Sequence, residues 1–194
     1  MVQIILIRPG ATDYDQQGRI QGVLDVPLCD EGAHEVARLS EELKDQGLEL
    51  IYSSACGRAL ETARGVAKAL DIKFKPLDNM QNLDHGLWQG MLVEDVKRKQ
   101  PKVYRQWQEQ PASVCPPEGE MLNDAQLRVR NVLGRLLRKH KQGKVGLVVP
   151  EPLASLVRAY LARGAVGDLW QAGILHGTWE IIDVEPHSLA HSGS

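Results

Sequence analysis

Three charged residues stand where hydrophobic segments end, and their types suit the binding of an anion. Arg8 follows VQIILI, Arg58 follows LIYSSACG, and Glu151 follows KVGLVVP. Two guanidinium groups on opposite sides of a crevice can each make paired, charge-assisted hydrogen bonds to a phosphate or a carboxylate. Arginines are also common as surface or ion-paired residues, so the spacing alone leaves both interpretations open.

The elements around these residues predict that they meet. Segments rich in strand-forming residues lie at 2–8, 48–54, 144–149 and 177–186, and segments with helical spacing of apolar residues lie at 30–47, 58–70, 123–143 and 153–164. Strands that alternate with helices form a largely parallel sheet with right-handed crossovers. Ligands bind beyond the carboxyl ends of such strands, where all three charged residues are expected.

Residues 78–121 interrupt this alternation. The segment contains Trp88, Trp107, four prolines and mixed charges. We expect an irregular or partly helical insertion over one edge of the sheet, a usual place for a lid or a specificity element. The chain is then a single domain over residues 1–186 with this insertion, followed by a flexible tail at 187–194.

The composition is that of an ordinary soluble globular protein and limits the classes of partner. The formal net charge of the 194 residues is -2, which gives no electrostatic case for nucleic acid or for a membrane surface. No apolar run has the length of a signal peptide or a membrane span, and the three cysteines fit reduced thiols. We expect a cytoplasmic protein without a metal or a cofactor, and nothing in the sequence determines its oligomeric state.

The sequence is similar to the histidine phosphatase superfamily, which includes phosphoglycerate mutases. LIRPGATDYDQQGRIQGVLDVPLCDEG resembles its opening signature, IYSSACGRALETA its second-arginine motif, and LDHGLWQG its GxWxG segment. PPEGEMLNDAQLRV and GLVVPEP follow in the family's order, so the resemblance covers residues 4 to about 160. It implies an α/β fold, a three-layer α/β/α sandwich with a mostly parallel sheet.

The resemblance also implies a phosphate site, part of which matches. Members of the family form a phosphohistidine on a histidine in the first turn, while two arginines and a second histidine bind the phosphoryl group. The residues of this chain that match the family's site are Arg8, Gly10, Thr12 and Arg58.

Four positions of the family's site carry other residues. Pro9 stands at the place of the nucleophilic histidine and Glu151 at that of the second histidine. Asn82 stands at the place of the acid, and Asp15 at that of a phosphate-binding asparagine. Proline has neither a nucleophile nor a backbone N–H, so Pro9 can neither carry nor donate to a phosphoryl group.

These substitutions change the charge of the expected site. Asp15 and Glu151 opposite two arginines bring the formal sum to about zero. We hypothesise that Glu151, and with it Asp15, pairs with Arg8 and Arg58 as an internal anion. The leading interpretation is then a catalytically inactive or strongly altered member of the family. It would be a binding or regulatory module whose remnant anion pocket faces a small anionic metabolite or a protein partner.

Two alternatives remain. One is a phosphatase or phosphotransferase that acts on a small phosphorylated metabolite through relocated residues, such as Glu151 or His85 as the base for a water. His176 also precedes a strand near the expected crevice, although a loop or surface role suits both histidines better. The other is a purely structural role with a sealed pocket.

Overall fold

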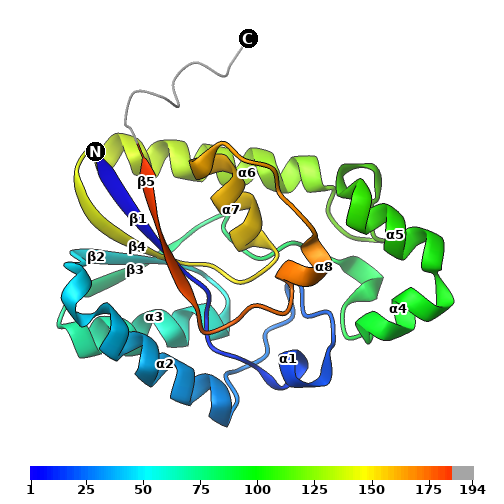
Figure 1. Cartoon of the computed structure of the whole chain (residues 1–194), viewed down its shortest axis with the longest axis horizontal. Coiled ribbons are helices and arrows are strands. Elements are labelled where there is room, and N and C mark those ends of the chain that lie inside the picture. The colour runs from blue at the N-terminus through cyan, green and yellow to red at the C-terminus, as the bar shows by residue number, and fades with distance from the viewer. Residues whose placement is uncertain (185–194) are drawn as a thin grey trace.

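The strand β1 (Val2–Ile7) pairs in parallel with β4 (Gly143–Val148) and antiparallel with β5 (Trp179–Val184) in the computed structural model, which describes residues 1–184. On the other side of β4 lie β2 (Leu50–Ser54) and β3 (Lys73–Leu77), both parallel to it. The strand order is β3-β2-β4-β1-β5 (Figure 1). The carboxyl ends of the four parallel strands therefore lie at one edge of the sheet.

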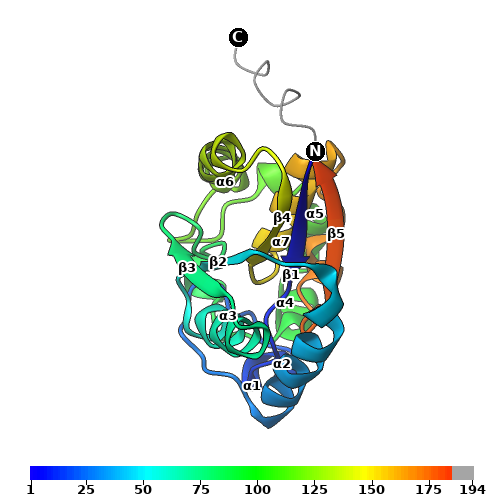
Figure 2. The same cartoon turned by 90° about the vertical axis from the view of Figure 1, so that its left-hand side faces the viewer.

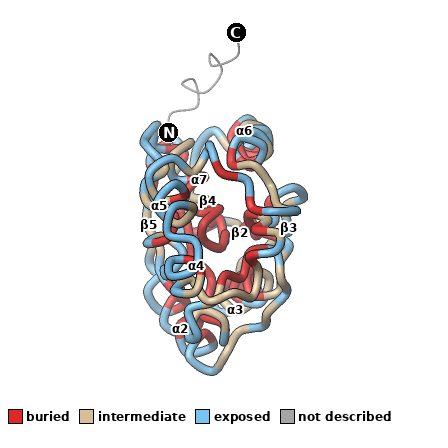
Figure 3. Tube along the Cα trace, turned by 90° about the vertical axis from the view of Figure 1, so that its right-hand side faces the viewer, coloured by how far each residue is buried: buried red, intermediate tan, exposed pale blue. Residues whose placement is uncertain are grey.

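Helices cover both faces of this sheet, which confirms the predicted three-layer α/β/α sandwich (Figure 2). The helices α2 (Asp30–Leu43) and α3 (Gly57–Leu70) pack on one face, and α6 (Leu122–Lys139) and α7 (Leu153–Ala162) on the other. Alternate residues of β1 point to opposite layers, as a strand requires: Ile5 faces the α2–α3 side and Leu6 the α6–α7 side. Figure 3 shows the buried residues concentrated in the sheet and exposed ones on the outer helices.

The segment 78–121 contains two short helices, α4 (Val93–Lys99) and α5 (Pro101–Glu109), and lies beside the ends of the strands (Figure 1). Pro101 occupies the first turn of α5, where its missing N–H costs nothing. Arg128 of α6 holds the start of the segment, because its guanidinium donates to the carbonyl oxygens of Asn79, Gln81 and Asn82. The insertion is thus tied to the main layers.

Some elements escape prediction from the sequence. β3 is a short edge strand with the sequence KFKPL, and its proline is tolerated because one side of an edge strand needs no donors. The helices α1 (Asp13–Gln17) and α8 (Leu169–Ala172) are too short to show a periodic pattern. The assignment of residues 1–186 to a single domain stays a prediction, and the tail at 187–194 lies outside the described residues. Within residues 1–184, no helix is both long and apolar enough to cross a bilayer.

Candidate functional site

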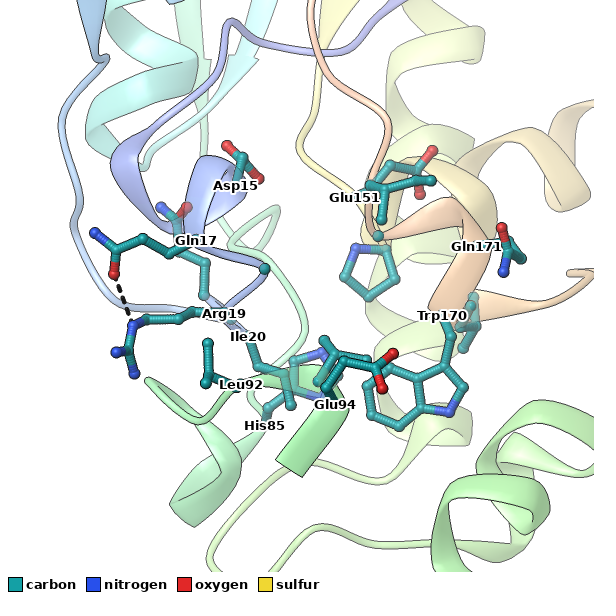
Figure 4. Close-up of a pocket in the computed structure, with 18 of the residues that line it drawn as sticks. Asp15, Gln17, Arg19, Ile20, His85, Leu92, Glu94, Glu151, Trp170 and Gln171 are labelled. Atoms are coloured by element: carbon teal, nitrogen blue, oxygen red, sulfur yellow. Dashed lines mark hydrogen bonds between the residues drawn. The ribbon is translucent and has the colours of Figure 1, made fainter. Parts of the chain in front are cut away.

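The three segments that follow β1, β2 and β4 meet around one pocket of about 460 Å³. Asp15 reaches it from α1, Arg58 from the first turn of α3, and Glu151 from the loop before α7. Figure 4 shows Asp15 on one side of this pocket and Glu151 on the other. The rim includes exposed residues such as Gln171 and Ile174, so the pocket is open and the alternative of a sealed pocket is wrong.

Arg8 lies behind Glu151 and is not among the residues that line the pocket. Its Nε donates to Glu151 Oε1 at 2.6 Å and its Nη2 to Glu180 Oε1 at 2.9 Å. Burial by itself lowers the pKa of Arg8, but the charges and hydrogen bonds of Glu151 and Glu180 outweigh it, so the pKa lies above its ordinary value. Arg8 is therefore a fixed cation that pairs with Glu151 and shares Glu180 with Arg158.

The second carboxylate oxygen of Glu151, Oε2, accepts hydrogen bonds from the first turn of α7. Ser155 donates to Oε2 through its backbone N at 3.1 Å and through Oγ at 2.8 Å. The backbone N–H groups of a first helical turn carry partial positive charge, which favours a carboxylate there. Glu151 is held rigidly, with its side chain only 1% exposed.

Arg58 is paired with Asp15 across the other side of the pocket. Its Nη1 lies 3.1 Å from Asp15 Oδ2, which also accepts from the backbone N and the Oγ1 of Thr12 at 2.7 and 3.0 Å. Thr12 is the N-cap of α1 and forms a capping box with Asp15. Both arginines thus have carboxylate partners, but the buried Nε of Arg58 has no acceptor within residues 1–184.

The turn around Pro9 has no free backbone donor. The N–H of Gly10 donates to Thr62 Oγ1 at 3.1 Å, and that of Ala11 donates to Glu35 Oε2 at 2.8 Å. A Cβ on Gly10 would collide with the carbonyl of Gly32 at the start of α2, so the turn packs closely against that helix. The turn therefore offers no backbone N–H to an anion in the pocket.

The side chain of Asn82 forms hydrogen bonds with backbone groups. Its Nδ2 donates to the carbonyl oxygens of Gly22 and Glu151 at 3.1 and 2.9 Å, and its Oδ1 accepts from Leu153 N at 3.3 Å. The residue is 1% exposed and does not line the pocket. Asn82 therefore holds the loop that carries Glu151.

The two histidines considered for a role in the crevice lie in different places. His85 lines the pocket and is packed against Trp88 and Trp107, with ring centroids at 6.4 and 5.5 Å. Burial lowers its pKa to about 4, so the ring is neutral at neutral pH. His176 does not line the pocket, and its Nδ1 lies 2.8 Å from Glu35 Oε1. No group of three or more His, Cys, Asp or Glu side chains within residues 1–184 is placed to hold a metal ion.

Much of the pocket wall was not predicted. The insertion supplies Leu92, Val93, Glu94, Tyr104 and Trp107, and α8 with its flanking loop supplies Leu169, Trp170, Gln171 and Ile174. The ion-pair partner Glu180 was also missed, because only the antiparallel register of β5, which sets it opposite Leu6, brings it near Arg8. The tryptophans of the insertion were the one available signal for this wall.

A three-layer fold with this pocket at the carboxyl ends of its strands defines a class of known proteins. The family model described as "Histidine phosphatase superfamily (branch 1)" matches residues 4–191, and the chain belongs to this superfamily. Phosphoserine phosphatase 1 of Hydrogenobacter thermophilus is 32% identical over 186 residues, which cover 95% of this chain and 88% of that protein.

Solved structures agree on the fold. YhfR of Bacillus stearothermophilus is 26% identical with a TM-score of 0.81, covering 95% of this chain and 92% of that one. A mycobacterial glucosyl-3-phosphoglycerate phosphatase, in complex with VO3, is 24% identical with a TM-score of 0.81, covering 92% and 90% of the two chains.

The prediction of a catalytically inactive binding module is wrong. Phosphoserine phosphatase 1, which is 32% identical over nearly the whole chain, is named as a phosphatase and contradicts this prediction. Both predicted ion pairs are present, but the conclusion that they put the site out of use does not follow from them. The contact with Asp15 uses Nη1 of Arg58, and the residue still lines the pocket.

Proposed function

We propose that this chain is a phosphatase that hydrolyses a small phosphorylated metabolite without a histidine at position 9. The observation that carries the proposal is Arg58, a buried arginine that lines the pocket and meets Asp15 through Nη1. The similarity to a phosphatase named for phosphoserine supports this reaction class. Arginine suits the role because its planar group can bind two phosphate oxygens at once.

In the proposed reaction, Arg58 binds the non-bridging oxygens and Glu151 accepts a proton from the attacking water. The P–O bond to the leaving group breaks as the water oxygen bonds to phosphorus, and the leaving oxygen takes up the proton of the phosphoryl group. Glu151 passes its proton to the solvent, and inorganic phosphate and an alcohol are released. Ser155 and Arg8 position the Glu151 carboxylate. His85 is the weaker candidate for this base, because burial against Trp88 and Trp107 disfavours the cation that it would become on accepting a proton.

The charge of the site favours a substrate with little negative charge. Arg8 and Arg58 are balanced by Asp15 and Glu151, so a dianion entering the pocket meets no net positive charge. A phosphate monoester loses its second proton near pH 6. We therefore propose that the monoanion is the form that reacts, and that turnover rises as the pH falls from about 7.5 to about 5.5.

The test is phosphate release from p-nitrophenyl phosphate and a panel of metabolite esters that includes O-phospho-L-serine. Arg58→Ala is expected to lower kcat/KM about 100-fold or more. Arg64→Ala, an exposed arginine of the same helix, is the matched control and keeps full turnover. Absence of phosphate release from every ester by the folded protein would refute the proposal, as would turnover that Arg58→Ala leaves unchanged.

The surroundings of the reaction are part of the proposal. The partner is a small phosphorylated metabolite, and the cytoplasm is the proposed compartment. Cys29, Cys56 and Cys115 are all free thiols, which supports a reducing environment.

A further inference from the structure

The ionised side chains of the pocket are dominated by carboxylates. Those that line it are Asp15, Arg19, Arg58, Glu94 and Glu151. Arg58 is the cation assigned to the phosphoryl group. A second negative charge on the substrate would therefore need Arg19 as its cationic partner. It would also approach the exposed carboxylate of Glu94 at the rim.

The guanidinium of Arg19 already donates hydrogen bonds to two other groups. Its Nε donates to Gln17 Oε1 at 2.7 Å and its Nη1 to the carbonyl oxygen of Gly90 at 2.6 Å. Figure 4 shows its side chain running toward Gln17 and away from Glu151 and Trp170. The guanidinium of Arg19 is thus turned away from the far wall of the pocket.

Two other basic groups, His85 and Lys97, supply no positive charge to the far wall of the pocket. His85 is neutral because burial lowers its pKa to about 4. Lys97 is not among the lining residues: it lies 3.8 Å from Glu94 and 5.8 Å from the centroid of the Tyr104 ring. Within residues 1–184, a carboxylate on the distal part of a substrate would find no cationic partner at that wall.

The far wall is instead apolar and rigid. It is formed by Tyr104, Trp107, Leu169 and Trp170. The rings of Tyr104 and Trp170 stack with centroids 5.0 Å apart and planes 6° apart, and Trp170 Nε1 donates to the carbonyl oxygen of Tyr104 at 3.0 Å. A surface fixed in this way binds an apolar group without a large cost for ordering side chains.

We propose that the pocket selects phosphate monoesters of uncharged, apolar or ring-bearing alcohols and rejects those whose alcohol part carries a carboxylate. This selectivity rests on the proposed function. It sets the chain apart from its relatives named for phosphoserine and glucosyl-3-phosphoglycerate, whose named substrates carry a carboxylate beside the phosphate. An apolar wall in a pocket whose lining includes Asp15, Glu94 and Glu151 disfavours such substrates by repulsion and by loss of hydration.

The test measures binding, so that it does not depend on turnover. Calorimetric titration of the full chain compares 4-carbamoylphenylphosphonate with 4-carboxyphenylphosphonate, two non-hydrolysable ligands of nearly equal shape that differ by one negative charge. Methylphosphonate serves as the ligand without a ring. We expect the carbamoyl compound to bind about tenfold more tightly than either of the others.

A matched variant tests the cause. Gln171→Lys places a cation on an exposed pocket residue of α8 and should shift the affinity ratio toward the carboxylated ligand. Equal or tighter binding of 4-carboxyphenylphosphonate by the unmodified protein would overturn the selectivity, as would methylphosphonate binding as tightly as the carbamoyl compound. Turnover of p-nitrophenyl phosphate by the same sample reports separately on the proposed function.

Discussion

Arg8 and Glu151 are separated by 143 residues in sequence and joined by a contact of 2.6 Å between Nε and Oε1. The contact exists because β1 and β4 are adjacent parallel strands, whose next residues leave the sheet side by side. Both side chains are nearly inaccessible, with 8% and 1% of their surfaces exposed. A buried pair of this kind contributes little when intact but costs several kcal/mol when one partner is removed.

The first prediction concerns the removal of one carboxylate from Arg8. Glu151→Gln should lower the free energy of unfolding by about 3 kcal/mol, because the buried guanidinium loses its closest counter-charge. Glu180→Gln is the matched control and should cost about 1 kcal/mol or less, since Glu180 is 30% exposed. Urea denaturation of both variants measures the difference, and equal losses would contradict this account of Arg8.

The second prediction concerns Asp15, which competes with phosphate for Arg58. Asp15→Asn removes a negative charge while its side-chain oxygen can still accept from Thr12 N. We expect inorganic phosphate to bind about tenfold more tightly, measured by calorimetry. Asp13→Asn, an exposed change on the same helix, should leave the affinity as it is. Unchanged phosphate affinity in Asp15→Asn would show that this carboxylate does not limit binding.

The third prediction concerns Pro9. Pro9→Ala should keep turnover within about twofold, because the proposed reaction uses no side chain at this position. The free energy of unfolding should fall by about 1 kcal/mol at most, since alanine gives the unfolded chain more freedom. The contact from Gly177 N to the carbonyl oxygen of residue 9 does not depend on the side chain. Loss of turnover in a well-folded Pro9→Ala protein would contradict the proposed chemistry.

The fourth prediction concerns acid stability. Burial lowers the pKa of His85 to about 4, against about 6.5 in the unfolded chain. Between these values the unfolded state binds a proton that the folded state does not, so the free energy of unfolding falls as the pH drops, by about 3 kcal/mol in total. His85→Phe should remove this contribution, and it also removes the buried Nδ1 that lacks a partner within residues 1–184.

Urea denaturation at several pH values from 7 to 4 measures this effect. The free energy of unfolding of His85→Phe should gain on that of the unmodified protein as the pH falls below 6.5. A constant difference across that range would show that His85 does not titrate differently in the folded and unfolded states.

The sequence predicted those parts of the fold whose residues carry a repeating pattern. Strands buried on both faces, such as β1, and amphipathic helices, such as α6, lie within a few residues of their predicted bounds. The edge strand β3 was not predicted, because its five residues include a proline and two lysines. Local pattern is enough where an element buries a whole face, and too little where tertiary contacts decide.

The site likewise has a part that the sequence predicted and a part that it did not. Motif order placed Arg58, Asp15 and Glu151 near one another, and their charges were enough to anticipate the ion pairs. The pocket wall of Tyr104 and Trp170 was out of reach, because it joins segments 66 residues apart through an irregular insertion. The prediction of inactivity was wrong because it was drawn from the substituted positions alone. The residues at those positions do not determine which reaction the other groups of the pocket can support.

The stack of rings has a practical consequence. Three of the four tryptophans, Trp88, Trp107 and Trp170, lie within 6.2 Å of one another between ring centroids. The fourth, Trp179, is on β5, where its Nε1 donates to Glu42. A ligand that displaces water beside Trp170 changes the surroundings of this coupled group of indoles. The chain therefore contains its own fluorescent reporter, and occupancy of the pocket can be followed by intrinsic emission without any label.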